Sequence, residues 1–143
     1  MNIKQINLLR EWREMRESAQ KNENTVQLVK SFFEDKPTVS FHTDPYTKKS
    51  WPSPWQLIYE DTYCEFTKIL AICYTLQLTT KFTGQSASIY IIRDIKNHKE
   101  YPVLYIGENC ICFEHFDMDE NNLTKSDFMI LLKDVMSPIH NEE

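Results

Sequence analysis

The sequence predicts one α+β domain over residues 1–143, in which helices come first, a small antiparallel sheet follows and a helix ends the chain. Apolar residues recur at spacings of three and four through most of residues 3–77, which is typical of helices that bury one face. After Gly84 the pattern changes to short runs rich in β-branched residues, which is typical of strands. The composition, with 41% hydrophobic and 13% aromatic residues, indicates a chain that builds a sizeable core.

An N-terminal helical part is expected over residues 1–36. Its second helix covers residues 25–33, with Asn24 as the cap and Pro37 beyond the end. Its first helix covers residues 3–19, where one stripe of side chains is apolar: Ile3, Ile6, Leu9, Trp12, Met15 and Ala19.

Two further helix starts follow. Ser53 precedes Pro54, a capping residue before proline at the first helical position, and this predicts a short helix over residues 54–60. Thr62 and Glu65 have the spacing of a capping box, so Thr62 is expected to cap a longer helix. The apolar surface of that helix is wide enough to predict the buried centre of the domain: Phe66, Ile69, Leu70, Ile72, Cys73, Tyr74 and Leu76.

The central helix is expected to pack on a three-stranded meander formed by residues 88–93, 101–106 and 110–116, with Gly107 in a tight turn. Residues 124–137 are then expected to form a C-terminal helix. The side chains at helical spacing that predict it are Phe128, Leu131, Leu132 and Val135.

Charge and composition exclude several classes of function. The net charge is -5 and the pI is about 5.4, which argues against nucleic-acid binding because phosphate contacts need clustered cations. No apolar run is long enough to cross a membrane, and the N-terminus lacks the apolar stretch of a signal peptide. With only Gly84 and Gly107, the chain has neither glycine-rich nucleotide motif nor a nucleophile elbow, so no cofactor is expected.

The four cysteines predict neither disulfides nor a metal site. They lie at positions 64, 73, 110 and 112, without a C-x-x-C pair and without a secretory signal. Cys110 and Cys112 would share one face of a strand, and with His115 they leave a zinc site open as an alternative. Small buried thiols are the favoured interpretation, because strand cysteines usually pack as hydrophobes.

Cys64 is the residue on which a chemical function would depend. With Thr62 as the cap it would lie inside the first helical turn, where unpaired N–H groups and the helix dipole stabilise a thiolate. The alternative is a buried thiol that fills a gap beneath Trp51 and Trp55. The two tryptophans would either line a binding groove or cover the end of the central helix, and packing is the favoured interpretation.

The run Trp51-Pro52-Ser53-Pro54-Trp55-Gln56-Leu57-Ile58, followed by Cys64-Glu65, resembles the nucleophile region of the transglutaminase-like (papain-like) superfamily. It is most similar to bacterial transglutaminase-like cysteine proteinases, over about residues 45–116. The resemblance implies a helix-start nucleophile at Cys64, a histidine that opens one strand and an aspartate on the next. Tyr101 occupies the place of that histidine, and the acid position falls near Glu114, so the resemblance implies a degenerate member.

Two functions from different classes follow. The first is a non-catalytic structural or interaction protein that binds other proteins, without nucleic acid or membrane. Lysines outnumber arginines twelve to four, a bias found in many bacteriophages, so the predicted role is a virion component (neck, tail or baseplate) or a phage accessory protein in the host cytoplasm. The second is a cysteine hydrolase or acyltransferase with Cys64 as nucleophile and His98 or His115 as base. A third possibility is a regulator that docks on one host protein through residues 3–19.

Overall fold

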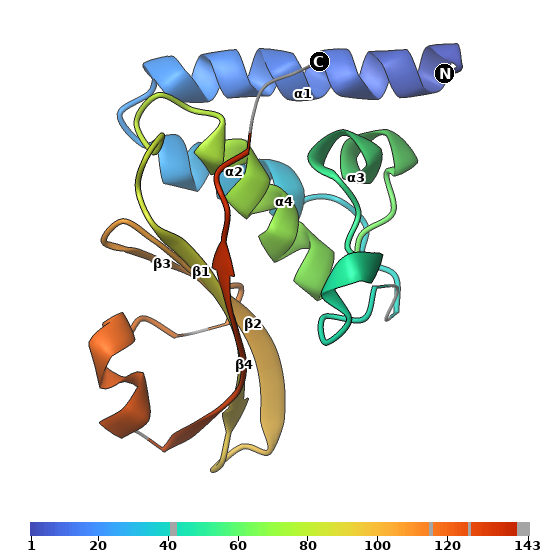
Figure 1. Ribbon diagram of the computed structural model, residues 1–143. Helices are drawn as coiled ribbons and strands as arrows, with labels where there is room; N and C mark the ends of the chain where they lie inside the picture. The colour runs from blue at the N-terminus through green and yellow to red at the C-terminus, as the bar shows by residue number, and fades with distance from the viewer. Residues whose placement is uncertain (41–42, 115, 126, 140–143) are drawn as a thin grey trace.

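The computed structural model describes residues 1–40, 43–114, 116–125 and 127–139. Within these ranges the chain folds into four α-helices and one four-stranded antiparallel sheet, so the predicted α+β class is confirmed. The helices lie on one face of the sheet, and a short 3₁₀ segment, η2 (Glu120–Lys125), lies on the other side (Figure 1). No helix in the described ranges is both long and apolar enough to cross a bilayer.

The first two helices form as predicted. Helix α1 covers Ile3–Lys21, and α2 covers Thr25–Glu34. Asn2 caps α1 by accepting a hydrogen bond from the backbone N–H of Gln5 at 2.9 Å. Of the predicted apolar stripe, Trp12, Met15 and Ala19 are buried, whereas Ile3 and Ile6 near the start of the helix are exposed.

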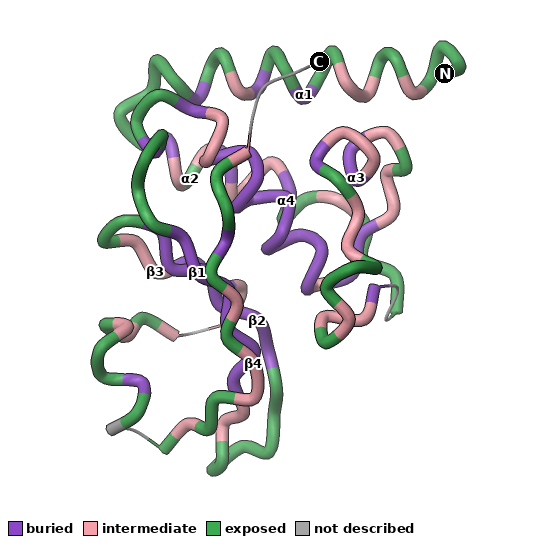
Figure 2. The backbone as a smooth tube through the Cα atoms, viewed as in Figure 1, coloured by how far each residue is buried: buried purple, intermediate pink, exposed green. Residues whose placement is uncertain are grey.

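Helix α3 (Pro54–Glu60) begins where the sequence predicts, with the hydroxyl of Ser53 accepting from the N–H of Gln56. Helix α4 (Glu65–Gln77) is the buried centre of the molecule. Every residue from 66 to 76 is buried, and Figure 2 shows this helix enclosed between the other helices and the sheet. The indole N–H of Trp12 donates to the hydroxyl of Thr75 at 3.0 Å and so ties α1 to α4.

Lys68 is a buried cation on α4. Its Nζ donates to the main-chain carbonyls of Glu34 and Lys36, at and just beyond the end of α2. Burial lowers the pKa of Lys68. The ammonium group therefore satisfies carbonyls that the end of α2 leaves without an intrahelical partner.

The start of α4 corrects one prediction. Thr62 does not cap the helix, because Cys64 is itself the N-cap residue and Glu65 is the first helical residue. Tyr63 is extended and forms a parallel β-bridge with Thr38, and its carbonyl accepts from the N–H of Val39 at 2.8 Å. Because Tyr63 is held in this contact with a distant segment, the helix begins two residues later than predicted. Nothing in the neighbouring sequence indicates the contact.

The sheet has the strand order β3-β2-β1-β4. Strands β1 (Ala87–Asp94) and β2 (Lys99–Ile106) pair along their whole length, as predicted. Strand β3 (Asn109–Ile111) is shorter than the predicted strand over residues 110–116 and pairs only with residues 104–106 of β2.

The predicted C-terminal helix over residues 124–137 is wrong. Residues 128–136 form strand β4 (Phe128–Met136), which pairs with β1, so the sheet has four strands instead of three. The five consecutive apolar residues from Phe128 to Leu132 suit a helix and a strand alike, and pairing with β1 decides between them. The strand is only partly covered: the ring of Phe128 packs on Phe116, and Leu131 and Leu132 pack against the cluster that contains α4, whereas Met129, Ile130 and Val135 are exposed.

Side chains on the two faces of the sheet form two separate hydrophobic clusters. The first cluster lies between the sheet and the helices and includes most of α4. The second cluster lies on the opposite face, beneath η2, and is rich in tyrosine. Its buried members are Tyr90, Ile92, Tyr101, Val103, Tyr105, Cys112 and Leu123.

Candidate functional site

Cys64 borders a cavity of about 290 Å³ between the start of α4 and the sheet. Its side chain belongs to the first cluster, and the residue is only 5% exposed. The walls are mostly apolar and come from α4, from the sheet and from the loop before α3: Thr38, Val39, Pro45, Glu65, Phe66, Ile91, Glu100, Tyr101 and Pro102.

Thr67 holds the cysteine in place. The backbone N–H of Cys64 donates to the Thr67 hydroxyl at 2.8 Å, which fixes the first turn of α4. The same hydroxyl lies 3.5 Å from Sγ of Cys64 and 3.2 Å from its carbonyl oxygen. Chemically, the helix start favours the thiolate, whereas the low exposure of the side chain limits access by a substrate.

Tyr101 reaches the same cavity but directs its ring elsewhere. Alternate residues of a strand point to opposite faces of the sheet, and the Tyr101 ring lies in the second cluster, 5.9 Å from the ring of Phe116. Burial, followed by the nearby Cys112, raises its pKa to about 12. The phenol of Tyr101, which the sequence resemblance places where the family has its histidine, therefore stays protonated at neutral pH, on the face opposite to Cys64.

Cations pair with two carboxylates at or near this cavity, Glu100 and Glu114. Glu114, which the sequence resemblance places near the family's acid position, lies 2.6 Å from Nζ of Lys99, and Glu100 pairs with Arg93 at 3.0 Å. Burial, with a smaller contribution from Glu114, raises the pKa of Glu65.

The structure does not bring His98 to Cys64. His98 is exposed in the turn between β1 and β2, with a left-handed backbone (φ 54°), and it is not among the described residues that line the cavity. His115 lies outside the described residues. The structure thus brings Cys64 and Tyr101 to one cavity, with Glu114 paired to Lys99.

The two tryptophans pack rather than line this cavity. The ring of Trp51 lies 5.1 Å from that of Phe66, and Trp55 meets Trp12 edge-to-face at 6.2 Å. The favoured interpretation of the W-P-S-P-W segment is therefore confirmed.

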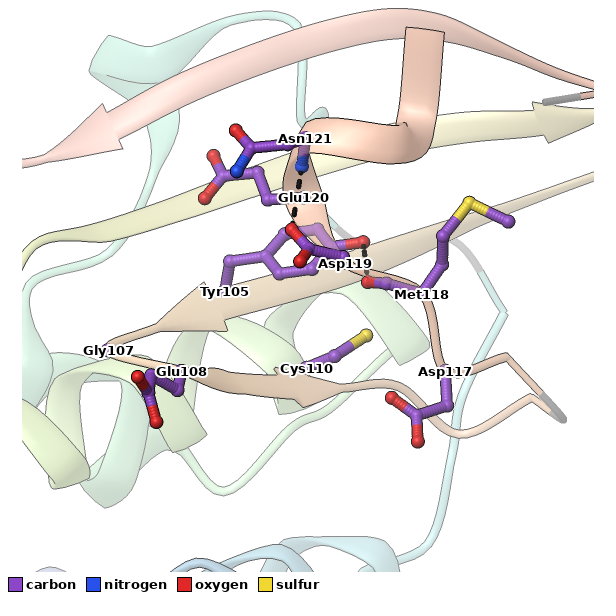
Figure 3. Close-up of a pocket in the computed structure, with 9 residues that line it drawn as sticks. All are labelled: Tyr105, Gly107, Glu108, Cys110, Asp117, Met118, Asp119, Glu120 and Asn121. Atoms are coloured by element: carbon purple, nitrogen blue, oxygen red, sulfur yellow. Dashed lines mark hydrogen bonds between the residues drawn. The ribbon is translucent and has the colours of Figure 1, made fainter. Parts of the chain in front are cut away.

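A larger hollow of about 510 Å³ lies on the other side of the sheet, between the β2–β3 turn and the segment that leads into η2. Figure 3 shows carboxylates around it, with Cys110 between Glu108 and Asp117 in the view. The Tyr105 hydroxyl donates to the carbonyl of Met118 at 2.8 Å and so holds the segment against the sheet. Asp117, Asp119 and Glu120 lie close together in the sequence, but only the fold brings Glu108 to the same hollow.

These side chains do not form a metal centre in the structure as described. Among the described residues, no group of three or more His, Cys, Asp or Glu side chains is placed to hold a metal ion. Cys110 and Cys112 face the second cluster together, and burial raises the pKa of both thiols, that of Cys112 to about 11. A raised thiol pKa disfavours the thiolate that zinc requires.

Comparison with known proteins gives one clear finding. No protein-family model matches the chain, and no curated protein matches it in sequence. Among solved structures, calcium-bound LapG of Legionella pneumophila, a transglutaminase-like cysteine protease, is similar with a TM-score of 0.61 and 15% sequence identity. The match covers 93% of this chain and 77% of LapG. The chain therefore has a transglutaminase-like fold.

Proposed function

We propose that this chain is a non-catalytic interaction protein built on a degenerate transglutaminase-like fold, and that it works as a component of a protein assembly such as a bacteriophage particle. The fold carries no function by itself, so the argument depends on the site. The observation that carries it is the position of Tyr101, whose ring packs on the face of the sheet opposite to Cys64.

Two further contacts support the proposal. A cysteine nucleophile needs a base within hydrogen-bond reach and a third group that orients this base. At the acid position, Glu114 instead pairs with Lys99. The Cys64 thiol is nearly buried and lies within reach of the Thr67 hydroxyl, which is an arrangement that suits packing.

A cysteine hydrolase or acyltransferase is the second candidate, and one observation favours it. Cys64 caps α4 and borders a cavity, so an acyl group in that cavity would lie near the N–H groups of the first helical turn. Such an enzyme would use His98 or His115 as its base.

Alkylation of the four cysteines, read by mass spectrometry across a range of pH, tests the proposal. Cys73 is fully buried and Cys110 is half-buried, so they serve as internal references for an inaccessible and a partly accessible thiol. We expect Cys64 to label slowly in the folded protein, close to Cys73, and to label fully only after unfolding.

Rapid labelling of Cys64 that persists well below about pH 8.5, the usual range of a thiol, would contradict the proposal. The enzyme would gain support if His98→Ala or His115→Ala abolished this rapid labelling. His140→Ala, a histidine to which no role is assigned, is the matched control and should leave the labelling rate unchanged.

A further inference from the structure

We propose that the protein assembles head to tail with copies of itself, through contact between a basic face of α1 and the acidic hollow beside η2. This inference deepens the interaction function proposed above, because it names a second copy of the chain as a partner. It depends on two oppositely charged surfaces that the fold places far apart.

The basic face carries three of the four arginines of the chain, Arg10, Arg13 and Arg16, at intervals of three residues on one helix. They line a hollow of about 240 Å³ together with Met1, Ile6 and Leu9. We call these six residues the arginine face.

Charged and apolar side chains on this face are exposed to solvent. Arg10 and Arg13 are exposed, and none of the ion pairs within 4.0 Å among the described side chains involves either of them. Met1 is 74% exposed and Ile6 is 42% exposed, so apolar surface lies beside the charge. Exposed apolar residues beside arginine are the composition found at the centres of protein interfaces.

The acidic hollow has the complementary composition. Between Gly107 and Asn122 the sequence contains five acidic residues and no lysine or arginine. Four of them line the hollow, and none of these four belongs to an ion pair among the described side chains: Glu108, Asp117, Asp119 and Glu120. With a volume of about 510 Å³, the hollow has room for side chains from another molecule.

The two surfaces cannot meet within one molecule. Helix α1 runs along one end of the fold, whereas η2 and its hollow lie at the other end, beyond the sheet (Figure 1). Contact between them therefore needs two copies. Because it joins unlike surfaces, it is a heterologous contact, which continues into rings or filaments and does not stop at a dimer.

A second copy fits the arginine face better than a membrane or a nucleic acid does. Glu11 and Glu14 follow Arg10 and Arg13 directly on α1, and an extended polyanionic surface would repel them. A discrete hollow with a few carboxylates pairs with individual guanidinium groups instead. Arginine also suits this role because its planar group binds a carboxylate through two parallel hydrogen bonds.

Sedimentation velocity and light scattering of the whole protein, over a range of concentrations and salt, test the inference. We expect species larger than the monomer at about 0.05 M salt, and an apparent dissociation constant at least about tenfold higher at about 0.5 M salt. A protein that stays monomeric at low salt and high concentration would overturn the inference.

Charge-swap variants make the test specific. Arg10→Glu with Arg13→Glu gives an acidic helix, and Asp117→Lys with Asp119→Lys gives a basic hollow. Each double variant alone should be monomeric, because its two surfaces then carry charges of the same sign. A mixture of the two variants should assemble again, since every contact between unlike copies is once more complementary. Failure of the mixture to assemble would overturn the inference.

The matched control reverses two exposed lysines outside both surfaces, Lys49→Glu with Lys96→Glu, and should assemble like the original protein. Thermal unfolding of each variant confirms that it folds. This experiment is independent of Cys64 labelling: a reactive Cys64 in a protein that still assembles would defeat only the proposed non-catalytic function. A monomeric protein with a protected Cys64 would defeat only the self-assembly.

Discussion

The two faces of the sheet are built in different ways. On one face, α4 is buried on all sides and the first cluster is mainly aliphatic. On the other face, tyrosines fill the second cluster, and their hydroxyl groups hold a short irregular segment in place. Tyr90 donates to Glu120 at 2.6 Å, and Tyr105 donates to the carbonyl of Met118. One face thus depends on helix packing, and the other depends on hydrogen bonds at the ends of aromatic rings.

The largest expected effect comes from a cavity in the first cluster. Leu70 on α4 is fully buried, so Leu70→Ala should lower the free energy of unfolding by about 2–5 kcal/mol. Leu123 in η2 is almost as buried, yet its short segment can move into the space, so Leu123→Ala should have a smaller effect. Urea unfolding of both variants measures the difference. An equal or larger loss at Leu123 would contradict the contrast between the two faces.

A smaller effect is expected where one hydrogen bond joins α1 to α4. Thr75→Val keeps the shape of the side chain but leaves the buried indole N–H of Trp12 without its acceptor. We expect a loss of about 1–3 kcal/mol in chemical unfolding. The control is Thr80→Val, because Thr80 is exposed and should tolerate the change within about 0.5 kcal/mol. Equal stability of the two variants would mean that this contact contributes nothing.

The tyrosines of the second cluster predict sensitivity to alkali. Burial raises the pKa of Tyr90, Tyr101 and Tyr105 above the unperturbed value of 10.0. The unfolded chain therefore loses these protons first, and stability should fall as the pH rises above about 10. Thermal unfolding between neutral and alkaline pH measures this loss. Tyr105→Phe should make the decline less steep, whereas Tyr59→Phe on α3 should leave it unchanged; the same slope in both variants would contradict the prediction.

The smallest expected effect concerns Glu65 at the start of α4. Burial raises the pKa of Glu65, so the folded protein binds the carboxyl proton more tightly than the unfolded chain does. The stability that this bound proton contributes is lost as the pH rises through the folded pKa. Glu65→Gln should therefore raise stability at neutral pH by less than about 1 kcal/mol. As the pH falls through the folded pKa, Glu65 gains its proton and the advantage should shrink. A variant that is less stable than the original protein at pH 7 would show that the negative charge helps the helix dipole more than burial opposes it.

The sequence predicts the helical half of the molecule better than the sheet because the signals there are local. The spacing of apolar residues places α1, α2 and α4, and Ser53-Pro54 places the start of α3. Strand β4 is missed because its apolar run fits two periodicities, and only its pairing with β1 distinguishes them.

In the candidate site, too, local features can be predicted from the sequence, whereas features that depend on distant contacts cannot. Cys64 at the start of a buried helix is visible in the sequence, but its position as the cap depends on Val39, which is 25 residues away along the chain. The direction of the Tyr101 ring depends on which face of β2 meets α4, and a strand pattern with apolar residues on both faces does not reveal that. Glu108 joins the acidic hollow only through the fold of the β2–β3 turn.

The buried ammonium group of Lys68 has a consequence for the order of folding. The carbonyls of Glu34, the last residue of α2, and of Lys36 just beyond it accept from a side chain more than 30 residues later in the chain, so α2 on its own lacks this donor at its end. A short helix in that state is marginal in water and frays. Docking of α4 is thus the event that completes α2, and the two helices should gain protection from hydrogen exchange together, as one cooperative unit.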